Sequence, residues 1–331
     1  MRLAEEMRHQ DQISVLGAGA FGTALAISLA RSGKPVTLWA RSTDAASSMQ
    51  SARENLGRLP GKSFPSRLSV TSDLPQACKA PILLLAVPMQ QLADFATQNK
   101  SLIRRKSLIA CCKGIDLKSD RGPLAVLEDV VPEAQLAILS GPSFAVDIAE
   151  GLPTALTLAA RDKGVVEALQ SVLTTDNIRL YSSLDPVGVE FGGALKNVIA
   201  IACGLAIGAG LGESARAALM TRGFAEMQRL AARVEADPAT LSGLSGFGDL
   251  VLTCTSEKSR NFSHGFKLGT GATVDPTITV EGVATARAVV HLARTLDLDM
   301  PITTTITQIL DGHISISEAV EVLLSRPLKR E

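Results

Sequence analysis

One lysine, Lys196, stands among mostly small and apolar residues in the segment EFGGALKNVIAIACGLAIG. The nearest carboxylate on its N-terminal side is Glu190. A lysine on a largely buried helix loses hydration, which favours release of its proton and suits it to proton transfer. Gly192 and Gly193 precede it by about one turn on the same helical face and would leave room for a ligand. The segment predicts a general acid; the alternative is an amine that extends to the surface.

A second polar group lies in the segment GFGDLVLTCTSEKSRNFSHG. Asp249 follows a glycine turn, and Thr253 comes one helical turn later. Three adjacent polar residues follow, namely Ser259, Arg260 and Asn261. A guanidinium beside hydroxyl and amide donors suits a phosphate monoester. The alternative is that Asp249 caps a helix and that the Ser-Arg-Asn run forms an exposed turn.

Three glycines form a GxGxxG pattern directly after the apolar run ISVL and before a helical pattern: Gly17, Gly19 and Gly22. In a dinucleotide-binding turn the first glycine permits the tight turn, the second lets the backbone approach a pyrophosphate, and the third lets the helix pack on the strand. The N–H groups at the helix N-terminus then bind the pyrophosphate. The pattern alone also fits an ordinary glycine-rich turn, but its place between a strand and a helix favours dinucleotide binding.

The second apolar run, VTLWA, is followed directly by Arg41. A carboxylate at this point binds the ribose 2′-OH of NAD, whereas an arginine suits the 2′-phosphate of NADP. Arg41 therefore favours NADPH, or the use of both cofactors, although the nearby Asp44 offers a partial replacement for the missing acid. The alternative is a solvated surface arginine.

Two further motifs follow apolar runs, CCKGI at 111–115 and SGPSFA at 140–145. The carboxyl ends of parallel strands meet at one edge of a sheet, and ligands of open α/β sheets bind at that edge. We therefore expect Lys113 and the SGPSFA segment to lie at the same edge.

The elements that must position these residues differ between the two halves of the chain. The first half alternates β-rich runs with helical patterns, which is typical of a parallel sheet covered by helices on both faces. The runs lie at 12–17, 36–40, 68–70, 81–87, 107–113, 135–141, 154–160 and 178–183. After Ser183 the pattern is helical and rich in alanine and leucine. We predict a Rossmann-type α/β domain over 1–186 and an all-α domain over 187–331.

The composition limits the partners of this chain. Its 33 Lys and Arg residues balance 33 Asp and Glu residues, so no overall field attracts nucleic acid or an anionic membrane. Five cysteines without CxxC spacing argue against disulfides or a zinc site and favour a reducing compartment. Residues 1–10 lack an apolar stretch, and the apolar run 197–212 is too short to span a bilayer. We expect a cytoplasmic enzyme without a metal and without membrane insertion.

Six motifs together resemble the NAD(P)-dependent glycerol-3-phosphate dehydrogenase family of the bacterial type. They are GAGAFGTALA, CCKGI, SGPSFA, GGALKNVIAI, the stretch from GDLVLTCTS to SRN, and VEGV, in the family's order and spacing. The resemblance covers nearly the whole chain. It implies a Rossmann-type N-terminal domain followed by an all-α C-terminal domain of the 6-phosphogluconate dehydrogenase-like type, and it is compatible with a homodimer.

The resemblance also implies the reaction, in which dihydroxyacetone phosphate is reduced to sn-glycerol 3-phosphate with NADPH or NADH, for glycerophospholipid synthesis. Lys196 is implied to be the proton donor, positioned by Asp249 and Thr253. The residues implied to hold the substrate are Lys113, Gly141, Ser143, Lys196, Asp249, Ser259, Arg260 and Asn261. Those implied to hold the cofactor are the three glycines of the turn with Ala20, Phe21, Arg41, Lys113, Ala145, Arg260, Thr279 and Glu281.

Two positions depart from the family pattern, because Ala20 stands where serine is common and Thr279 where valine is common. The first change removes a hydroxyl near the pyrophosphate, which backbone N–H groups can replace; the second weakens the expectation that Thr279 binds the cofactor. Two alternative functions stay open. One is a related dehydrogenase that acts on a β-hydroxyacid or ketopantoate, and the other is a dinucleotide-binding module without turnover.

Overall fold

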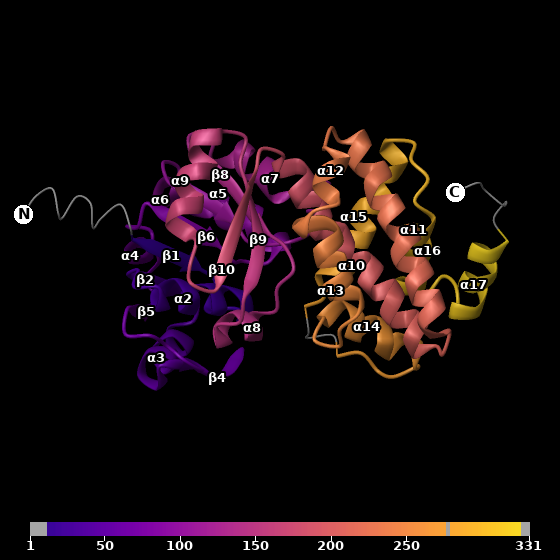
Figure 1. Cartoon of the computed structure of the whole chain (residues 1–331), viewed down its shortest axis with the longest axis horizontal. Coiled ribbons are helices and arrows are strands. Elements are labelled where there is room, and N and C mark those ends of the chain that lie inside the picture. The colour runs from indigo at the N-terminus through magenta and orange to yellow at the C-terminus, as the bar shows by residue number, and fades with distance from the viewer. Residues whose placement is uncertain (1–11, 276–278, 326–331) are drawn as a thin grey trace, which may run out of the picture. The chain divides into compact units, whose positions relative to one another are not determined.

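The structure is a computed structural model that describes residues 12–275 and 279–325 (Figure 1). Its contacts divide the chain into two compact units. The first comprises Met1–Lys113 and Pro123–Val189, and the second comprises Gly114–Gly122 and Glu190–Glu331. The short segment 114–122 thus belongs with the second unit, although it interrupts the sequence of the first. The opening segment considered above, 1–10, lies outside the described residues.

The first unit is built on an eight-stranded sheet with the order β10-β9-β8-β7-β6-β1-β2-β5 (Figure 1). Its strands are β1 (Ile13–Leu16), β2 (Val36–Trp39), β5 (Leu68–Thr71), β6 (Ile82–Leu85), β7 (Ser107–Ala110), β8 (Gln135–Ser140), β9 (Thr154–Ala159) and β10 (Ile178–Ser183). Each predicted run contains one of these strands. Six neighbouring strands of this sheet, β5-β2-β1-β6-β7-β8, follow the order of a Rossmann sheet. In that order the direction of strand succession reverses beside β1.

One pairing differs from the parallel sheet that the sequence predicts, because β9 runs antiparallel to β8. The connection between these strands contains α8 (Ala145–Glu150), a helix of six residues. Such a helix spans about 9 Å, whereas a strand as long as β8 spans roughly 20 Å. The short helix therefore does not carry the chain back to the far edge, and β9 starts at the edge where β8 ends.

Both faces of the sheet are apolar, because successive strand residues point to opposite sides. In β6, Ile82 and Leu84 belong to one buried cluster, and Leu83 and Leu85 belong to another. Helices α2 (Ala20–Arg31), α3 (Thr43–Ala52), α8 and α9 (Lys163–Leu173) contribute residues to the first cluster. Helices α4 (Leu74–Ala77), α5 (Met89–Gln98), α6 (Lys100–Ile103) and α7 (Pro123–Val130) contribute residues to the second. The prediction of helices on both faces is confirmed.

A small antiparallel hairpin, β3 (Glu54–Asn55) with β4 (Leu59–Ser63), was not predicted from the sequence. A strand of two residues has too little periodicity to be recognised. Its inner residue, Asn55, is a polar side chain that is only 4% exposed. A buried amide of this kind needs hydrogen-bond partners, and these are described with the glycine turn.

Over residues 190–275 and 279–325 the second unit contains helices and no strand, as predicted. The helices are α10 (Pro186–Gly208), α11 (Gly212–Arg233), α12 (Pro238–Leu241), the π-helix η1 (Leu244–Gly248), α13 (Asp249–Cys254), α14 (Arg260–Gly269), α15 (Glu281–Thr295), α16 (Pro301–Leu310) and α17 (Ile316–Leu324). By length and composition α10 could cross a membrane, but 89% of its most apolar window is buried within the protein. It packs as a core helix.

The backbones of α10 and α14 are in direct contact. Four glycines face the other helix, two on each: Gly204, Gly208, Gly265 and Gly269. A Cβ atom added at Gly204 or Gly265 would lie 2.0 Å from a carbonyl oxygen of the opposite helix, and the corresponding distances are 2.2 Å at Gly208 and 2.4 Å at Gly269. Any side chain at these positions would push the two helices apart.

Glu226 of α11 is 1% exposed and joins α11 to α16. Its carboxylate accepts hydrogen bonds from the backbone N–H groups of Ile302 and Thr303, at 2.5 and 3.1 Å, and from the Thr303 hydroxyl at 2.9 Å. N–H groups in the first turn of a helix have no acceptor within the helix. Glu226 therefore caps α16 from a distant part of the sequence, and its burial raises the pKa of the Glu226 carboxyl.

All five cysteines are free and buried. Burial raises the pKa of the Cys78 thiol to about 11, and it also raises the pKa of Cys111 and Cys254. The thiolate is the reactive form of cysteine, so these side chains act as small apolar residues of the core.

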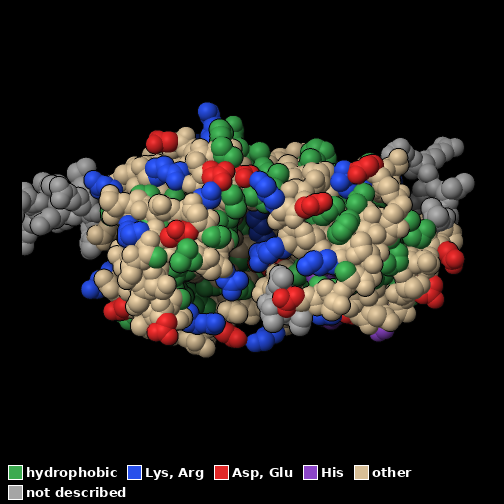
Figure 2. Space-filling model, turned by 90° about the horizontal axis from the view of Figure 1, so that it is seen from below, with side chains coloured by type: hydrophobic (Ala, Val, Ile, Leu, Met, Phe, Trp, Pro, Cys, Tyr) green, Lys and Arg blue, Asp and Glu red, His purple; other side chains and the backbone are tan. Residues whose placement is uncertain are grey.

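The surface carries charges of both signs. Lys and Arg side chains and Asp and Glu side chains are both exposed on the face shown in Figure 2. The net charge of the chain is zero, so an anionic ligand must be captured by local groups of side chains and not by an overall field.

The contact between α10 and α14 predicts a strong effect of Gly204→Ala. The added methyl group must displace α14, which should lower the free energy of unfolding by at least about 1–3 kcal/mol in urea unfolding experiments. Gly57→Ala is the matched control, since a Cβ atom at Gly57 has no neighbour within 4 Å. Equal stability of Gly204→Ala and the wild type would contradict the close packing of the two helices.

Glu226 predicts a pH dependence of stability. Because its pKa is raised on folding, the folded protein binds the proton of this carboxyl more tightly than the unfolded chain does. The resulting stabilisation is present below the ordinary glutamate pKa of about 4.3 and is lost as the pH rises through the raised value. The free energy of unfolding of the wild type, measured relative to Glu226→Gln, should therefore fall with rising pH. A difference that stays constant or grows would contradict the assignment.

Candidate active site

The glycine turn begins where β1 ends and leads into α2. Gly17 has a φ of +126°, which favours glycine, and a Cβ atom there would lie 2.5 Å from the carbonyl oxygen of Ala86. A Cβ atom at Gly22 would lie 2.1 Å from the carbonyl oxygen of Gly17. At Gly19, by contrast, a Cβ atom would meet nothing within 4 Å. The turn is packed against protein at Gly17 and Gly22 and open at Gly19.

The N-terminus of α2 presents hydrogen-bond donors beside this open position. Gly19 is the N-cap residue, no side chain caps the helix, and Ala20 and Phe21 are its first two residues. The first N–H groups of a helix lack acceptors within the helix and attract anions. Open space at Gly19 beside these donors fits the pyrophosphate of a dinucleotide.

Asn55 of β3 contacts this turn and was missed by the sequence analysis. Its Nδ2 group donates to the carbonyl oxygen of Ala18 at 3.0 Å and to the Thr23 hydroxyl at 2.8 Å. In the sequence, Asn55 lies 37 residues after Ala18 and 32 residues after Thr23. Nothing in the pattern around Asn55 signals this contact.

Arg41 lies two positions after the end of β2 and is exposed. Because β1 and β2 are parallel, with Leu16 paired to Trp39, Arg41 follows its strand at the same sheet edge as the glycine turn. Asp44 is exposed in the first turn of α3, where a carboxylate interacts favourably with the helix N-terminus.

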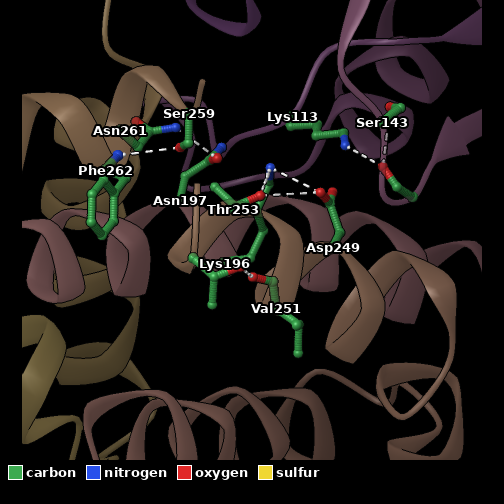
Figure 3. Close-up of polar contacts among 12 residues, drawn as sticks. Lys113, Ser143, Lys196, Asn197, Asp249, Val251, Thr253, Ser259, Asn261 and Phe262 are labelled. Carbon is green, nitrogen blue, oxygen red and sulfur yellow. Dashed lines mark hydrogen bonds and ion pairs between the residues drawn. The ribbon is translucent and has the colours of Figure 1, made fainter. Parts of the chain in front are cut away.

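The two motifs expected at the carboxyl edge of the sheet do meet there. The Lys113 Nζ atom donates to the carbonyl oxygen of Gly141 at 3.0 Å, and the Ser143 hydroxyl donates to the same oxygen at 3.3 Å (Figure 3). Gly141 has a φ of +140°, which favours glycine. Ala145 begins α8 two residues after Ser143. The first unit thus brings Lys113 and the SGPSFA segment together.

In the second unit, Lys196 forms a buried triad with Asp249 and Thr253 (Figure 3). The Lys196 Nζ atom lies 2.7 Å from the Thr253 hydroxyl oxygen and 3.1 Å from Oδ1 of Asp249. The Thr253 hydroxyl donates to the same carboxylate at 3.2 Å. Lys196, Asp249 and Thr253 are 8%, 1% and 3% exposed. The amine does not extend to the surface, so the alternative considered for Lys196 is wrong.

The role expected for Gly192 is corrected by the structure. A Cβ atom at Gly192 would lie 2.8 Å from the carbonyl oxygen of Ser245 in η1. The space beside this glycine is therefore filled by the backbone of η1 and is not open to a ligand ring. The close approach of η1 to α10 instead places Asp249, which directly follows η1, beside Lys196.

The Ser-Arg-Asn run is the start of α14 and not an exposed turn. Ser259 is buried and caps this helix, its hydroxyl accepting a hydrogen bond from the N–H of Phe262 at 3.2 Å. Asn261 is buried and donates to Oδ1 of Asn197 at 2.8 Å (Figure 3). Its own Oδ1 accepts from the N–H of Gly282 at 3.0 Å. These bonds join α10, α14 and α15.

Asn197 is a second residue that sequence reasoning missed. It is 2% exposed, and its Nδ2 atom has no hydrogen-bond partner among the described residues. A buried amide donor without an acceptor is costly, which makes Asn197 a candidate ligand-binding residue. The one signal in the sequence was its position directly after Lys196.

Arg260 lines a cavity of about 120 Å³ on one side of α14. Lys258, His264 and Lys267 also line it, together with the carboxylates of Glu257 and Asp275. Burial and the nearby Lys267 lower the pKa of His264. The Arg260 guanidinium donates to the carbonyl oxygen of Thr279 at 3.4 Å. 

The two other positions implied for the cofactor lie where α15 begins. The backbone carbonyl of Thr279 accepts the hydrogen bond from Arg260. Glu281 is the first residue of α15, after the N-cap residue Val280. In the part of the chain that the structure describes, no group of three or more His, Cys, Asp or Glu side chains is placed to hold a metal ion.

Comparison with known proteins identifies the family. Models of the N- and C-terminal parts of NAD-dependent glycerol-3-phosphate dehydrogenase match residues 12–166 and 185–321. The glycerol-3-phosphate dehydrogenase (NAD(P)+) of Ruegeria sp. strain TM1040 is 60% identical over 319 residues, which cover 96% of this chain and 99% of that protein. A crystal structure of glycerol-3-phosphate dehydrogenase from Coxiella burnetii superposes with a TM-score of 0.91 at 37% identity, covering 96% of this chain and 100% of the other. This chain belongs to the NAD-dependent glycerol-3-phosphate dehydrogenase family.

Proposed function

We propose that this chain reduces dihydroxyacetone phosphate to sn-glycerol 3-phosphate with NADPH or NADH. The similar protein from Ruegeria, at 60% identity, carries the name of this activity. The observation that carries the proposal is the buried contact of Lys196 with Asp249 and Thr253. It supplies an oriented ammonium group, which is what the reduction of a ketone to an alcohol requires.

The chain's own part in the reaction is to handle charge and the proton. The bound reduced nicotinamide supplies the hydride. The Lys196 ammonium stabilises negative charge on the C2 oxygen and delivers a proton to it from Nζ, and the neutral amine takes the proton back in the reverse direction. Asp249 stabilises the ammonium, and Thr253 fixes its direction. Proton transfer by such a group contributes about a hundredfold to ten-thousandfold, and the proposed reaction needs no metal.

Within each unit, the family resemblance assigns polar groups to the substrate and its phosphate. In the second unit these are Ser259, Arg260 and Asn261, and the unsatisfied Nδ2 donor of Asn197 supports adding that residue to them. In the first unit they are Lys113, Gly141 and Ser143, which already share one hydrogen-bonded cluster. Arginine with amide and hydroxyl donors favours a phosphate over the carboxylate of a β-hydroxyacid or ketopantoate.

The cofactor would bind the glycine turn through its pyrophosphate. Backbone N–H groups at Gly19, Ala20 and Phe21 supply the donors, so the serine hydroxyl absent at Ala20 is not needed. The exposed Arg41, two positions after the end of β2, supports a preference for NADPH. Lys113, Ala145, Arg260, Thr279 and Glu281 are assigned to the cofactor by the family resemblance.

The cellular setting follows from the reaction class and the composition. The product would feed glycerophospholipid synthesis in the cytoplasm, where five free cysteines are compatible with a reducing environment. A net charge of zero supports a small-molecule partner and not nucleic acid. Association into a homodimer, without membrane insertion, completes the proposal.

A spectrophotometric assay tests the function directly. Oxidation of each reduced cofactor is followed with dihydroxyacetone phosphate and, in parallel, with 2-ketopantoate. We expect turnover with dihydroxyacetone phosphate, and NADPH should serve at least as well as NADH. Turnover with 2-ketopantoate alone would refute the substrate, binding of NADPH without turnover would favour the non-catalytic module, and a large preference for NADH would refute the role of Arg41.

Lys196→Ala should bind NADPH as the wild type does and lose nearly all turnover, by about a hundredfold or more. The variant removes the proton donor and leaves the glycine turn unchanged. Lys163→Ala is the matched control, because Lys163 is an exposed lysine on α9. Thermal unfolding of both variants shows whether each is folded. Substantial turnover by folded Lys196→Ala would mean that another group transfers the proton.

A further inference from the structure

We infer that Asn55 is a positioning residue for the cofactor, because its amide fixes the direction of the peptide group between Ala18 and Gly19. This inference rests on the proposed binding of a dinucleotide at the glycine turn. Asn55 does not belong to the turn and lies in the separate hairpin of β3 and β4. Its function would be to hold the Gly19 N–H group in the direction that a pyrophosphate requires.

The hydrogen bonds of Asn55 define the orientation of its amide. The Oδ1 atom accepts from the backbone N–H of Arg58 at 3.2 Å, and an N–H group can only donate. The Nδ2 atom donates to the Ala18 carbonyl, which can only accept, and to the Thr23 hydroxyl. Both ends of the amide are thus satisfied, and a reversed amide would lose the bonds to Arg58 and Ala18.

The bond to Ala18 controls the next N–H group along the chain. In a trans peptide the carbonyl oxygen of one residue and the N–H of the next point in opposite directions. Holding the Ala18 oxygen towards Asn55 therefore directs the Gly19 N–H to the opposite side. Glycine has a low barrier to alternative φ values, so without this bond the peptide could rotate and present its oxygen to the ligand.

The second bond links the same amide to α2. Thr23 is fully buried in the first two turns of that helix, and its N–H bonds to the Gly19 carbonyl at 2.9 Å. One side chain thus contacts the turn before Gly19 and the helix after it. The hairpin is closed at its base, where the Phe64 N–H donates to the Arg53 carbonyl at 2.7 Å, and it is anchored by Leu59 and Phe64, which are buried in the first core cluster. Asn55 therefore acts from a fixed support.

The test compares Asn55→Ala with the wild type in NADPH binding, measured by fluorescence titration. We expect the Kd for NADPH to rise about tenfold or more, with the KM for NADPH rising in parallel and the KM for dihydroxyacetone phosphate unchanged. Adenosine 2′-monophosphate, which lacks a pyrophosphate, should bind both proteins equally. An unchanged Kd for NADPH, or equal weakening of both ligands, would overturn the inference.

Asn177→Ala is the matched control. Its amide also bridges groups within the first unit, donating to the carbonyl oxygens of Ile148 and Leu152 at 3.1 and 3.3 Å and accepting from the Ser28 hydroxyl in the second half of α2 at 2.7 Å, without a contact to the glycine turn itself. The variant should lose stability without a change in the Kd for NADPH. If Asn177→Ala weakens NADPH binding as much as Asn55→Ala does, the effect is a general loss of structure and the inference fails.

A milder variant covers the case in which Asn55→Ala does not fold. Asn55→Ser keeps a short donor, so it should still bind NADPH, with a Kd higher than that of the wild type. A wild-type Kd would overturn the inference. If the proposed substrate is wrong, the wild type will bind NADPH without reducing dihydroxyacetone phosphate. That outcome is distinct from a failure of the inference on Asn55, which the comparison of Kd values for NADPH would still test.

Discussion

A buried ammonium group must be paired with a buried anion, and the second unit is organised around this requirement. Lys196 and Asp249 are 8% and 1% exposed and lie 3.1 Å apart. Removing either charge from water without its partner would cost several kcal/mol. The pair therefore requires α13 to begin beside the middle of α10. The π-helix η1, a form that often marks functional sites, and the small Gly192 make this approach possible.

Glycine serves the same physical purpose in both units, because it lets backbones approach where a side chain would intervene. In the second unit the paired glycines of α10 and α14 bring the helices into contact, so that Asn261 at the start of α14 reaches Asn197 on α10. In the first unit Gly22 brings α2 against the glycine turn. In each case close backbone packing places polar donors that a looser contact would leave out of reach.

The antiparallel direction of β9 also has a consequence for function. Because α8 is short, the connection from β8 to β9 stays at the carboxyl edge of the sheet. That connection contains Gly141 and Ser143, which meet Lys113 after β7. A long crossover helix would instead have carried the chain to the opposite edge. The departure from a parallel sheet thus keeps three candidate ligand-binding residues together.

The strands of the sheet, the glycine turn, the helical second half and the family could all be predicted from the sequence, because each depends on local periodicity or on short ordered motifs. The sequence also identified Lys196, Asp249, Thr253 and the Ser-Arg-Asn run, whose residue types suggest their chemistry. The direction of β9, the contact made by Gly192 and the hydrogen bonds of Asn55 and Asn197 became apparent only in the folded structure. These depend on contacts between residues far apart in the sequence, 32 positions for Asn55 with Thr23 and 64 for Asn197 with Asn261. No local pattern records such a contact, since the partner of a buried amide is set by how the chain packs.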